Sequence, residues 1–199
     1  FALALEGTIE RGRRKFVFEL GVGPTPVSLE WEGETLAFAW MTQPGPAFGP
    51  ALTDRSALAR AIGVSEADLV PGLPVQYVSC GVPYVLVPLV SRAAVDAVTV
   101  DRHAFARCCR EAGLDETPGF FFSTGPGSPE GTTYSRMIAP GLGIAEDPAT
   151  GSAAGPLGSY LLHHRVVTPD VARSMVNLQG FAMGRPSRIH IAIDGGPEN

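Results

Sequence analysis

The chain carries the stretch Glu146-Asp-Pro-Ala-Thr-Gly-Ser-Ala-Ala-Gly155, which leads directly into Pro-Leu-Gly-Ser-Tyr-Leu-Leu-His-His164. The dipeptide Asp147-Pro148 predicts a turn, because proline pushes the residue before it out of the helical region. A helix follows whose residues are small or apolar. Five of them have little or no side chain, namely Gly151, Ala153, Ala154, Gly155 and Gly158. Such a helix lets other backbones come close, so we expect a sheet to wrap around it.

The start of this helix is the first candidate site. We expect the helix to begin near Gly151 or Ser152, with Thr150 or Ser152 as its N-cap. The amides at a helix N-terminus favour a bound carboxylate. Asp147 would then be an acid or base beside a bound anion, although Asp and Thr in such a turn are often plain caps. Three features favour a site: the paired carboxylates at 146–147, the room that Gly151 gives a ligand, and the small residues of the helix.

Composition excludes several classes of protein. The net charge of -5 and the pI near 5.3 argue against a nucleic-acid-binding surface. No apolar run is long enough to span a membrane, and no signal peptide is recognisable. Three cysteines, two of them adjacent, do not make a disulfide framework and fit a reducing cytoplasm. No Cys/His spacing resembles a zinc site, and no glycine-rich phosphate loop is present.

Four segments resemble the PhzF-like phenazine biosynthesis family. The central one is Glu146-Asp-Pro-Ala-Thr-Gly-Ser-Ala153, preceded by Arg136-Met-Ile-Ala-Pro140 and followed by Gly180-Phe-Ala-Met-Gly-Arg-Pro-Ser187. Val78-Ser-Cys-Gly-Val-Pro83 is close to the family's usual Ser-Thr-Gly version. The resemblance covers nearly the whole chain. It implies an α+β fold of the diaminopimelate epimerase type, in which two pseudo-symmetric lobes each curl a mixed β-sheet around a central helix.

The resemblance also implies an activity. The family's type member isomerises trans-2,3-dihydro-3-hydroxyanthranilate without a cofactor. A Glu of its N-terminal lobe takes the proton, assisted by a His-Pro-Thr motif and by the Asp and Ser that correspond to Asp147 and Ser152. The Glu and the His-Pro-Thr motif lie upstream of the point that corresponds to Phe1, and this sequence shows neither. We therefore expect a segment upstream of Phe1 in the intact protein.

The chain divides near its densest Pro/Gly segment. Pro44 to Pro50 is expected to break regular structure and to mark a domain boundary. Residues 1–43 would be the remainder of an N-terminal lobe, and residues 44–199 a C-terminal lobe. Packing of the last strands of this C-terminal lobe back on the first lobe is left open. A weak internal repeat supports two similar lobes, because a helix, a strand, a Gly/Pro turn and a strand are expected in both 1–31 and 151–193.

Other elements follow from periodicity and capping residues. Strands are expected over 15–20, 27–31, 35–41, 75–80, 84–89, 119–123, 132–139, 174–179 and 188–193. Helices are expected over about 54–62, capped by Thr53, and after Ser65, Ser91 and Asp101. Residues 1–7 are expected to end a helix, 21–26, 124–131 and 169–172 to form turns, and the last residues a tail. Cys108 and Cys109 are expected to be core thiols, and His163 and His164 to end a helix.

Two functions remain open. The first is a cofactor-independent isomerase of a small carboxylate, with Asp147 and Ser152 as catalytic residues and the segment Thr150-Gly151-Ser152-Ala153 binding the substrate. The second is a non-catalytic protein of the same fold that binds a small anion or a partner; a structural subunit without a ligand is a more distant alternative. We expect no metal, no nucleic acid and no membrane. A homodimer is a further expectation from the resemblance.

Overall fold

The computed structural model describes residues 3, 6–124 and 131–194. The chain forms two units, Phe1–Gly45 and Pro46–Asn199, and the division falls inside the Pro44–Pro50 segment. The expected helix end before Gly7, the turn over 124–131 and the C-terminal tail lie largely or wholly outside the described residues.

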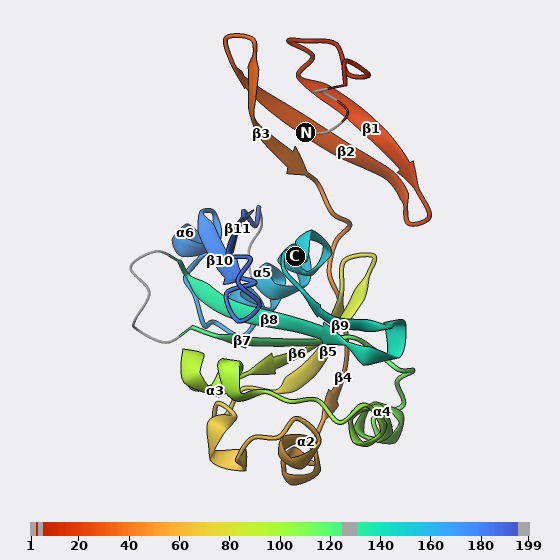
Figure 1. Cartoon of the computed structure of the whole chain (residues 1–199), viewed down its shortest axis with the longest axis vertical. Coiled ribbons are helices and arrows are strands. Elements are labelled where there is room, and N and C mark those ends of the chain that lie inside the picture. The colour runs from red at the N-terminus through yellow and green to blue at the C-terminus, as the bar shows by residue number, and fades with distance from the viewer. Residues whose placement is uncertain (1–2, 4–5, 125–130, 195–199) are drawn as a thin grey trace. The chain divides into compact units, whose positions relative to one another are not determined.

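The first unit is built on a three-stranded antiparallel sheet of order β1-β2-β3 (Figure 1). Its strands are β1 (Lys15–Leu20), β2 (Gly23–Glu32) and β3 (Thr35–Met41). Alternating side chains put Val27, Leu29 and Leu36 into one small apolar cluster. A tight turn joins β2 to β3, because Glu32 pairs with Thr35 across only two residues.

The expected turn over residues 21–26 is wrong in its second half, because β2 already begins at Gly23. Pro24 and Pro26 lie in this part of the strand, opposite Glu19 and Val17 of β1. The ladder with β3 begins only at Val27. Ahead of it, the Pro26 carbonyl accepts a bond from the Thr42 N–H at 2.9 Å, so this part of β2 meets the β3 side only at its last residue. A proline is tolerated where its missing N–H faces such an open edge.

The second unit contains a mixed sheet of order β11-β10-β8-β7-β6-β5-β4, and β9 pairs with β8 beside this path. The pairs β6–β7 and β8–β10 are parallel, and the other pairs are antiparallel. The strands are β4 (Ala47–Leu52), β5 (Val75–Ser79), β6 (Pro83–Pro88), β7 (Gly119–Ser123), β8 (Thr133–Ala139), β9 (Ile144–Asp147), β10 (Met175–Gln179) and β11 (Ser187–Ile191).

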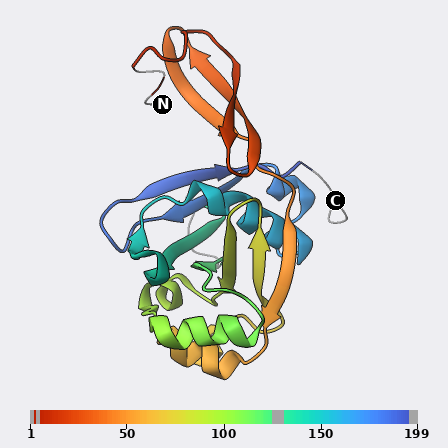
Figure 2. The ribbon, with the colours of Figure 1, turned by 90° about the vertical axis from the view of Figure 1, so that its right-hand side faces the viewer.

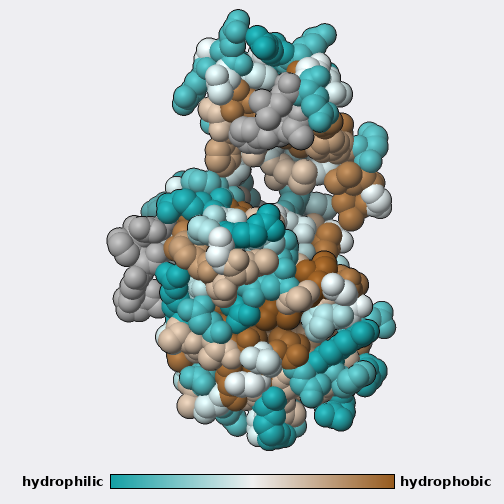
Figure 3. All heavy atoms as spheres, in the orientation of Figure 1, coloured by the Kyte–Doolittle hydropathy of each residue, from teal (hydrophilic) through white to brown (hydrophobic). Residues whose placement is uncertain are grey.

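Helices cover both faces of this sheet (Figures 1 and 2). One face packs against α2 (Arg55–Ala61), α3 (Arg92–Ala97) and α4 (Arg102–Glu111), and the other against α5 (Ala154–His163) and α6 (Pro169–Ala172). Hydrophilic side chains gather on the outer surface where α2 and α4 lie (Figure 3). Short 3-10 turns are η1 (Glu66–Asp68), η2 (Pro140–Leu142) and η3 (Gly151–Ala153). The sheet and its helices thus form an α+β unit with one apolar core on each face.

Helix α5 lies inside the core, as its small residues predicted. All its residues from Pro156 to Leu162 are buried. A Cβ at Gly158 would lie 2.8 Å from Ile191 and 2.7 Å from Ile193, so glycine is needed for the close approach of this helix to the end of the sheet. The expected helices after Ser65, Ser91 and Asp101 are confirmed, and each of these three side chains accepts a backbone N–H bond.

Several predicted boundaries are wrong. Pro44–Pro50 does not break all regular structure, because β4 begins at Ala47. This strand lies at the edge of the sheet and has an irregular register between Phe48 and Ala51, a position that accommodates Pro50. The first helix of this unit is capped by Asp54 rather than Thr53. Strand β9 was not predicted, and the turn expected over 169–172 is a short helix.

Candidate functional site

The adjacent carboxylates Glu146 and Asp147 serve different parts of the structure. They end strand β9, so their side chains point to opposite faces. Glu146 accepts two hydrogen bonds from Arg136, at 3.1 Å from Nε and 2.7 Å from Nη2. Both side chains are 13% exposed. Glu146 is therefore a structural ion-pair partner, and its presence beside Asp147 is not evidence for a site.

Arg136 also ties this ion pair to helix α3. Its Nη1 atom donates to the carbonyl oxygens of Val98 at 2.9 Å, Asp96 at 3.0 Å and Val95 at 3.3 Å. Carbonyl groups at the end of a helix lack partners within it, and a guanidinium suits their partial negative charge. The guanidinium thus fixes β9 relative to α3 and, with it, the position at which Asp147 begins its turn.

Asp147 faces the side of the sheet on which α5 lies. It pairs with Met137 of β8, whose side chain belongs to the core around α5. Asp147 is half-buried, and its Oδ2 accepts a 2.6 Å hydrogen bond from the hydroxyl of Thr150. Thr150 itself is only 5% exposed. The turn predicted at Asp147-Pro148 is present, and it folds a carboxylate back over the start of the helix.

The helix start differs from the prediction. A 3-10 turn over Gly151–Ala153 precedes the α-helix, which begins at Ala154. Thr150 precedes this turn, but its side chain does not cap it; the hydroxyl donates to Asp147 instead. Ser152 does not cap the helix either, because its hydroxyl bonds Tyr84. The plain-cap alternative is therefore wrong for Thr150, and the cap expected from Thr150 or Ser152 is formed by neither side chain.

The amides of this segment are partly used within the protein. The N–H of Ala153 donates to the carbonyl of Thr150 at 3.2 Å. The N–H of Thr150 donates to Gln179 Oε1 at 3.3 Å. A substrate that bound the amides of Thr150 and Ala153, as expected from the sequence, would compete with those bonds. Gly151 and Ser152 are exposed, and a Cβ at Gly151 would meet no protein atom within 4 Å, so space lies beside this part of the turn.

Tyr84 was not predicted as part of the site. It follows Val78–Pro83 at the start of β6 and is 3% exposed. Its hydroxyl lies 2.7 Å from that of Ser152. Burial raises the pKa of the Tyr84 phenol, the bond to Ser152 lowers it less, and the nearby Asp147 carboxylate raises it further. The phenol therefore stays protonated near neutral pH.

Gln179 is a second residue that the sequence reasoning missed. It ends β10 and is fully buried, at 0% exposure. Its amide group bonds the Asp147 carbonyl at 2.7 Å and the Thr150 hydroxyl at 2.8 Å. The next residue, Gly180, has φ +79, and a Cβ there would lie 2.7 Å from the carbonyl oxygen of Pro148. The end of β10 is thus packed directly against the Asp147 turn.

The cysteines and the two adjacent histidines lie in the core or at the end of a helix. Cys108 and Cys109 are buried in the core beneath α4, and burial raises the pKa of both thiols. Burial also raises the pKa of Cys80, to about 11. His163 stacks on Phe48, and His164, the C-cap of α5, bonds the side chain of Gln76. These contacts confirm core thiols and helix-end histidines.

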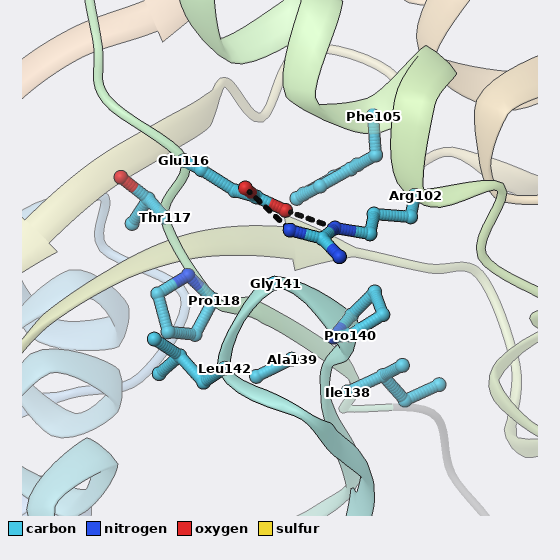
Figure 4. A pocket seen from close by; sticks show the side chains of 10 residues that line it. All are labelled: Arg102, Phe105, Glu116, Thr117, Pro118, Ile138, Ala139, Pro140, Gly141 and Leu142. Atoms are coloured by element: carbon cyan, nitrogen blue, oxygen red, sulfur yellow. Dashed lines mark hydrogen bonds and ion pairs between the residues drawn. The ribbon is translucent and has the colours of Figure 1, made fainter.

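The second unit has a small pocket that none of these residues lines (Figure 4). It is lined by residues of α4, the segment 116–118 and the end of β8 with its following turn. Two hydrogen bonds join Arg102 and Glu116 across it, and Glu116 packs so tightly on Gly141 that a Cβ there would overlap the carboxylate. No predicted site residue lines this pocket.

Within residues 3, 6–124 and 131–194, no group of three or more His, Cys, Asp or Glu side chains is placed to hold a metal ion. Among the helices of the same residues, none combines the length and the apolar character needed to cross a membrane.

Comparison with known proteins identifies the family. The family model "Phenazine biosynthesis-like protein" matches residues 1–199, so the chain belongs to this family, named PhzC-PhzF. The resemblance that the four motifs carry is thereby confirmed. The fold agrees as well: the structure of a PhzF-family protein from Bacillus anthracis superimposes with a TM-score of 0.80 at 23% identity, over 94% of this chain and 62% of that one.

Curated relatives carry isomerase names. An uncharacterized isomerase of Escherichia coli (strain K12), YddE, is 37% identical over 166 residues, which are 79% of this chain and 54% of the relative. The trans-2,3-dihydro-3-hydroxyanthranilate isomerase of Pseudomonas aeruginosa is 31% identical over 198 residues, 99% of this chain and 64% of the relative. The chain therefore spans between half and two thirds of the length of these relatives.

The two missed residues adjoin motifs that the sequence did indicate. Tyr84 directly follows Val78–Pro83, and Gln179 directly precedes Gly180–Ser187. Their positions next to two segments of the family resemblance were the available signal. Neither could be assigned a partner from the sequence, because each contacts a residue at least 29 positions away.

Proposed function

We propose that the protein is an isomerase that moves a proton on a small carboxylate substrate without a cofactor, with Asp147 and Ser152 as its catalytic residues. The observation that carries this proposal is the convergence of the Asp147 carboxylate with the hydroxyls of Thr150, Ser152 and Tyr84 at the start of α5. Membership of a family whose relatives are named isomerases supports the reaction class.

The reaction would conserve all atoms of the substrate. A C–H bond next to a carboxylate-bearing system breaks, and its electron pair forms a new double bond. The electron pair of the neighbouring double bond then shifts to its far carbon, where a proton is added. In the proposal, Asp147 holds or transfers that proton, since a positioned carboxyl group is a common general acid or base. Ser152, with Tyr84 behind it, binds the substrate or relays a proton through its hydroxyl. Thr150, Gly151, Ser152 and Ala153 form the substrate-binding segment.

The experiment uses exchange with solvent deuterium. The protein is incubated with trans-2,3-dihydro-3-hydroxyanthranilate in D2O, and the isomer formed and its deuterium content are followed by NMR and mass spectrometry. Asp147→Asn is expected to lower turnover by about 10²–10⁴-fold, the usual contribution of a general acid or base. Glu146→Gln is the matched control, because it makes the same chemical change one residue earlier. Equal turnover in wild type and Asp147→Asn would refute the catalytic role.

A second candidate is a non-catalytic protein of the same fold that binds a small anion. The observation that favours it is the exposed turn at Gly151 and Ser152, where a Cβ at Gly151 would meet no protein atom within 4 Å, so a small anion has room there without any chemistry. Binding of the same compound, measured by calorimetry, without formation of its isomer would support this candidate over the isomerase. A cytoplasmic location is proposed from the three free cysteines. A homodimer is proposed from the family resemblance alone, and light scattering after gel filtration tests it.

A further inference from the structure

The buried amide of Gln179 holds both ends of the turn that presents Asp147. Its Nε2 donates to the Asp147 carbonyl at 2.7 Å and to Thr150 Oγ1 at 2.8 Å, and its Oε1 accepts from the Thr150 N–H at 3.3 Å. One side chain thus binds the first residue of the turn through its backbone and the last residue through its backbone and its hydroxyl. No part of Gln179 is exposed to solvent.

These contacts leave only one orientation for the amide group. A carboxamide has a donor end and an acceptor end. The Thr150 N–H needs an acceptor, and the Asp147 carbonyl needs a donor. If the amide were turned over, its NH₂ would face the Thr150 N–H and its oxygen would face the Asp147 carbonyl. Both contacts would then be repulsive.

The orientation of the amide decides the direction of the Thr150 hydroxyl. Since Gln179 Nε2 donates to Thr150 Oγ1, the oxygen is an acceptor on that side. The single proton of the hydroxyl is then available for Asp147 Oδ2, which lies at 2.6 Å. The chain of donors therefore runs from Gln179 to Thr150 to Asp147 and ends on the carboxylate oxygen.

We propose that Gln179 is a positioning residue: through Thr150 it fixes the rotamer of the Asp147 side chain and keeps a hydrogen-bond donor on that carboxylate. The inference rests on the proposed function, since it gives Asp147 a catalytic role. Burial of the amide is what makes the arrangement effective, because no water competes for the same donors and acceptors. Gly180, packed against the Pro148 carbonyl, holds the end of β10 against the turn.

The same strand supplies a matched control. Asn177 lies two residues earlier on the same face and is 1% exposed. Its amide is also fully engaged, with Oδ1 accepting from Thr133 at 2.9 Å and Nδ2 donating to Ser135 at 2.9 Å. These partners belong to β8 and not to the Asp147 turn. Asn177→Asp therefore makes the same buried amide-to-acid change without removing a hydrogen bond between Gln179 and the Asp147 turn.

Four variants test whether Gln179 positions the Asp147 side chain or only stabilises the fold. Gln179→Glu keeps the shape and the acceptor but removes both donors, so the Thr150 hydroxyl turns away from Asp147. Gln179→Leu removes the donors and the acceptor of the side chain together. It introduces no buried charge, so it replaces Gln179→Glu if that charge prevents folding. Thr150→Val removes the hydroxyl, and Thr150→Ser restores it. With trans-2,3-dihydro-3-hydroxyanthranilate as the probe, kcat should fall about 10–100-fold in the first three, the range expected for a misplaced catalytic group, with KM little changed.

The pattern across the variants identifies the role. Thr150→Ser should keep most of the wild-type kcat. Gln179→Leu combined with Thr150→Val should lower kcat by less than the product of the two single effects, because both variants disturb the bond from the Thr150 hydroxyl to Asp147. Asn177→Asp should lower stability but leave kcat per folded molecule unchanged. If Asn177→Asp lowers kcat as much as Gln179→Glu does, Gln179 is only a structural residue and the proposal is overturned.

A crystal structure of a variant tests the positioning role of Gln179 independently of catalytic activity. In the Gln179→Leu structure the Asp147 carboxylate should leave Thr150 or lose defined density. An unchanged contact between Asp147 Oδ2 and Thr150 Oγ1 would overturn the positioning role, whatever the activity. If the wild-type chain fails to convert the probe while this contact breaks in the variant, the proposed function fails and the positioning of Asp147 by Gln179 stands.

Discussion

The ion pair between Arg136 and Glu146 should contribute to stability asymmetrically. Arg136→Met leaves the Glu146 carboxylate, 13% exposed, without a cation and removes the donor from three carbonyl groups at the end of α3. Removing one partner of a buried ion pair typically costs about 3–5 kcal/mol. Glu146→Gln removes only the charge on the other partner, and Arg136 keeps its three carbonyl acceptors. The loss should then be about 1.5–3 kcal/mol, the range for a hydrogen bond to a charged group.

The assay must report on the second unit. Both tryptophans of the chain, Trp31 and Trp40, lie in the first unit, so their fluorescence follows that unit alone. Far-UV circular dichroism at 222 nm follows the helices of the second unit during urea or thermal unfolding. For a domain of this size, each kcal/mol of lost stability lowers the midpoint temperature of unfolding by about 2–4 °C. Arg136→Met should therefore lower that temperature by roughly 6–20 °C.

A double-mutant cycle completes the test. The combined variant should lose less than the sum of the two single variants, with a coupling of about 0.5–3 kcal/mol, because both remove the same pair of bonds. Turnover of Glu146→Gln, measured per folded molecule, should stay near the wild-type value. The reasoning is refuted if Arg136→Met costs less than about 1 kcal/mol, a typical cost for any single substitution, or if Glu146→Gln costs as much as Arg136→Met.

Three more outcomes are expected. Gly180→Ala should lower stability by at least about 2 kcal/mol, because a left-handed backbone disfavours a side chain and its Cβ would overlap the Arg185 carbonyl oxygen; an unchanged urea midpoint would contradict this. Tyr84→Phe should reduce kcat about 2- to 12-fold through loss of the bond to Ser152, with folding judged by circular dichroism; full activity would exclude a supporting role. Burial lowers the pKa of His164 from 6.5, so the neutral form is favoured in the fold and stability should fall as pH drops through and below 6.5; His164→Asn should lessen that loss in thermal unfolding, and an equal loss would contradict it.

The sequence predicted most elements because their signals are local. Ser65, Ser91 and Asp101 each start a helix with a side-chain acceptor, and alternating apolar residues marked the strands of both units. It also predicted the turn at Asp147 and a helix of small residues inside the core. Its errors were local as well: β9 is too short for a periodic signal, and prolines were read as breaks where edge positions tolerate them.

The tertiary structure alone decided the roles of the residues around that turn. Strand alternation sends Glu146 to Arg136 and Asp147 to the start of α5, so two adjacent acids have separate functions. Hydroxyl and amide partners for Asp147, Thr150 and Ser152 include Tyr84 and Gln179, which come from other strands of the sheet. A side chain's type and its local pattern are written in the sequence. Its hydrogen-bond partner is chosen by burial between elements distant in the chain, where each polar group must find a protein partner or leave its bond unmade.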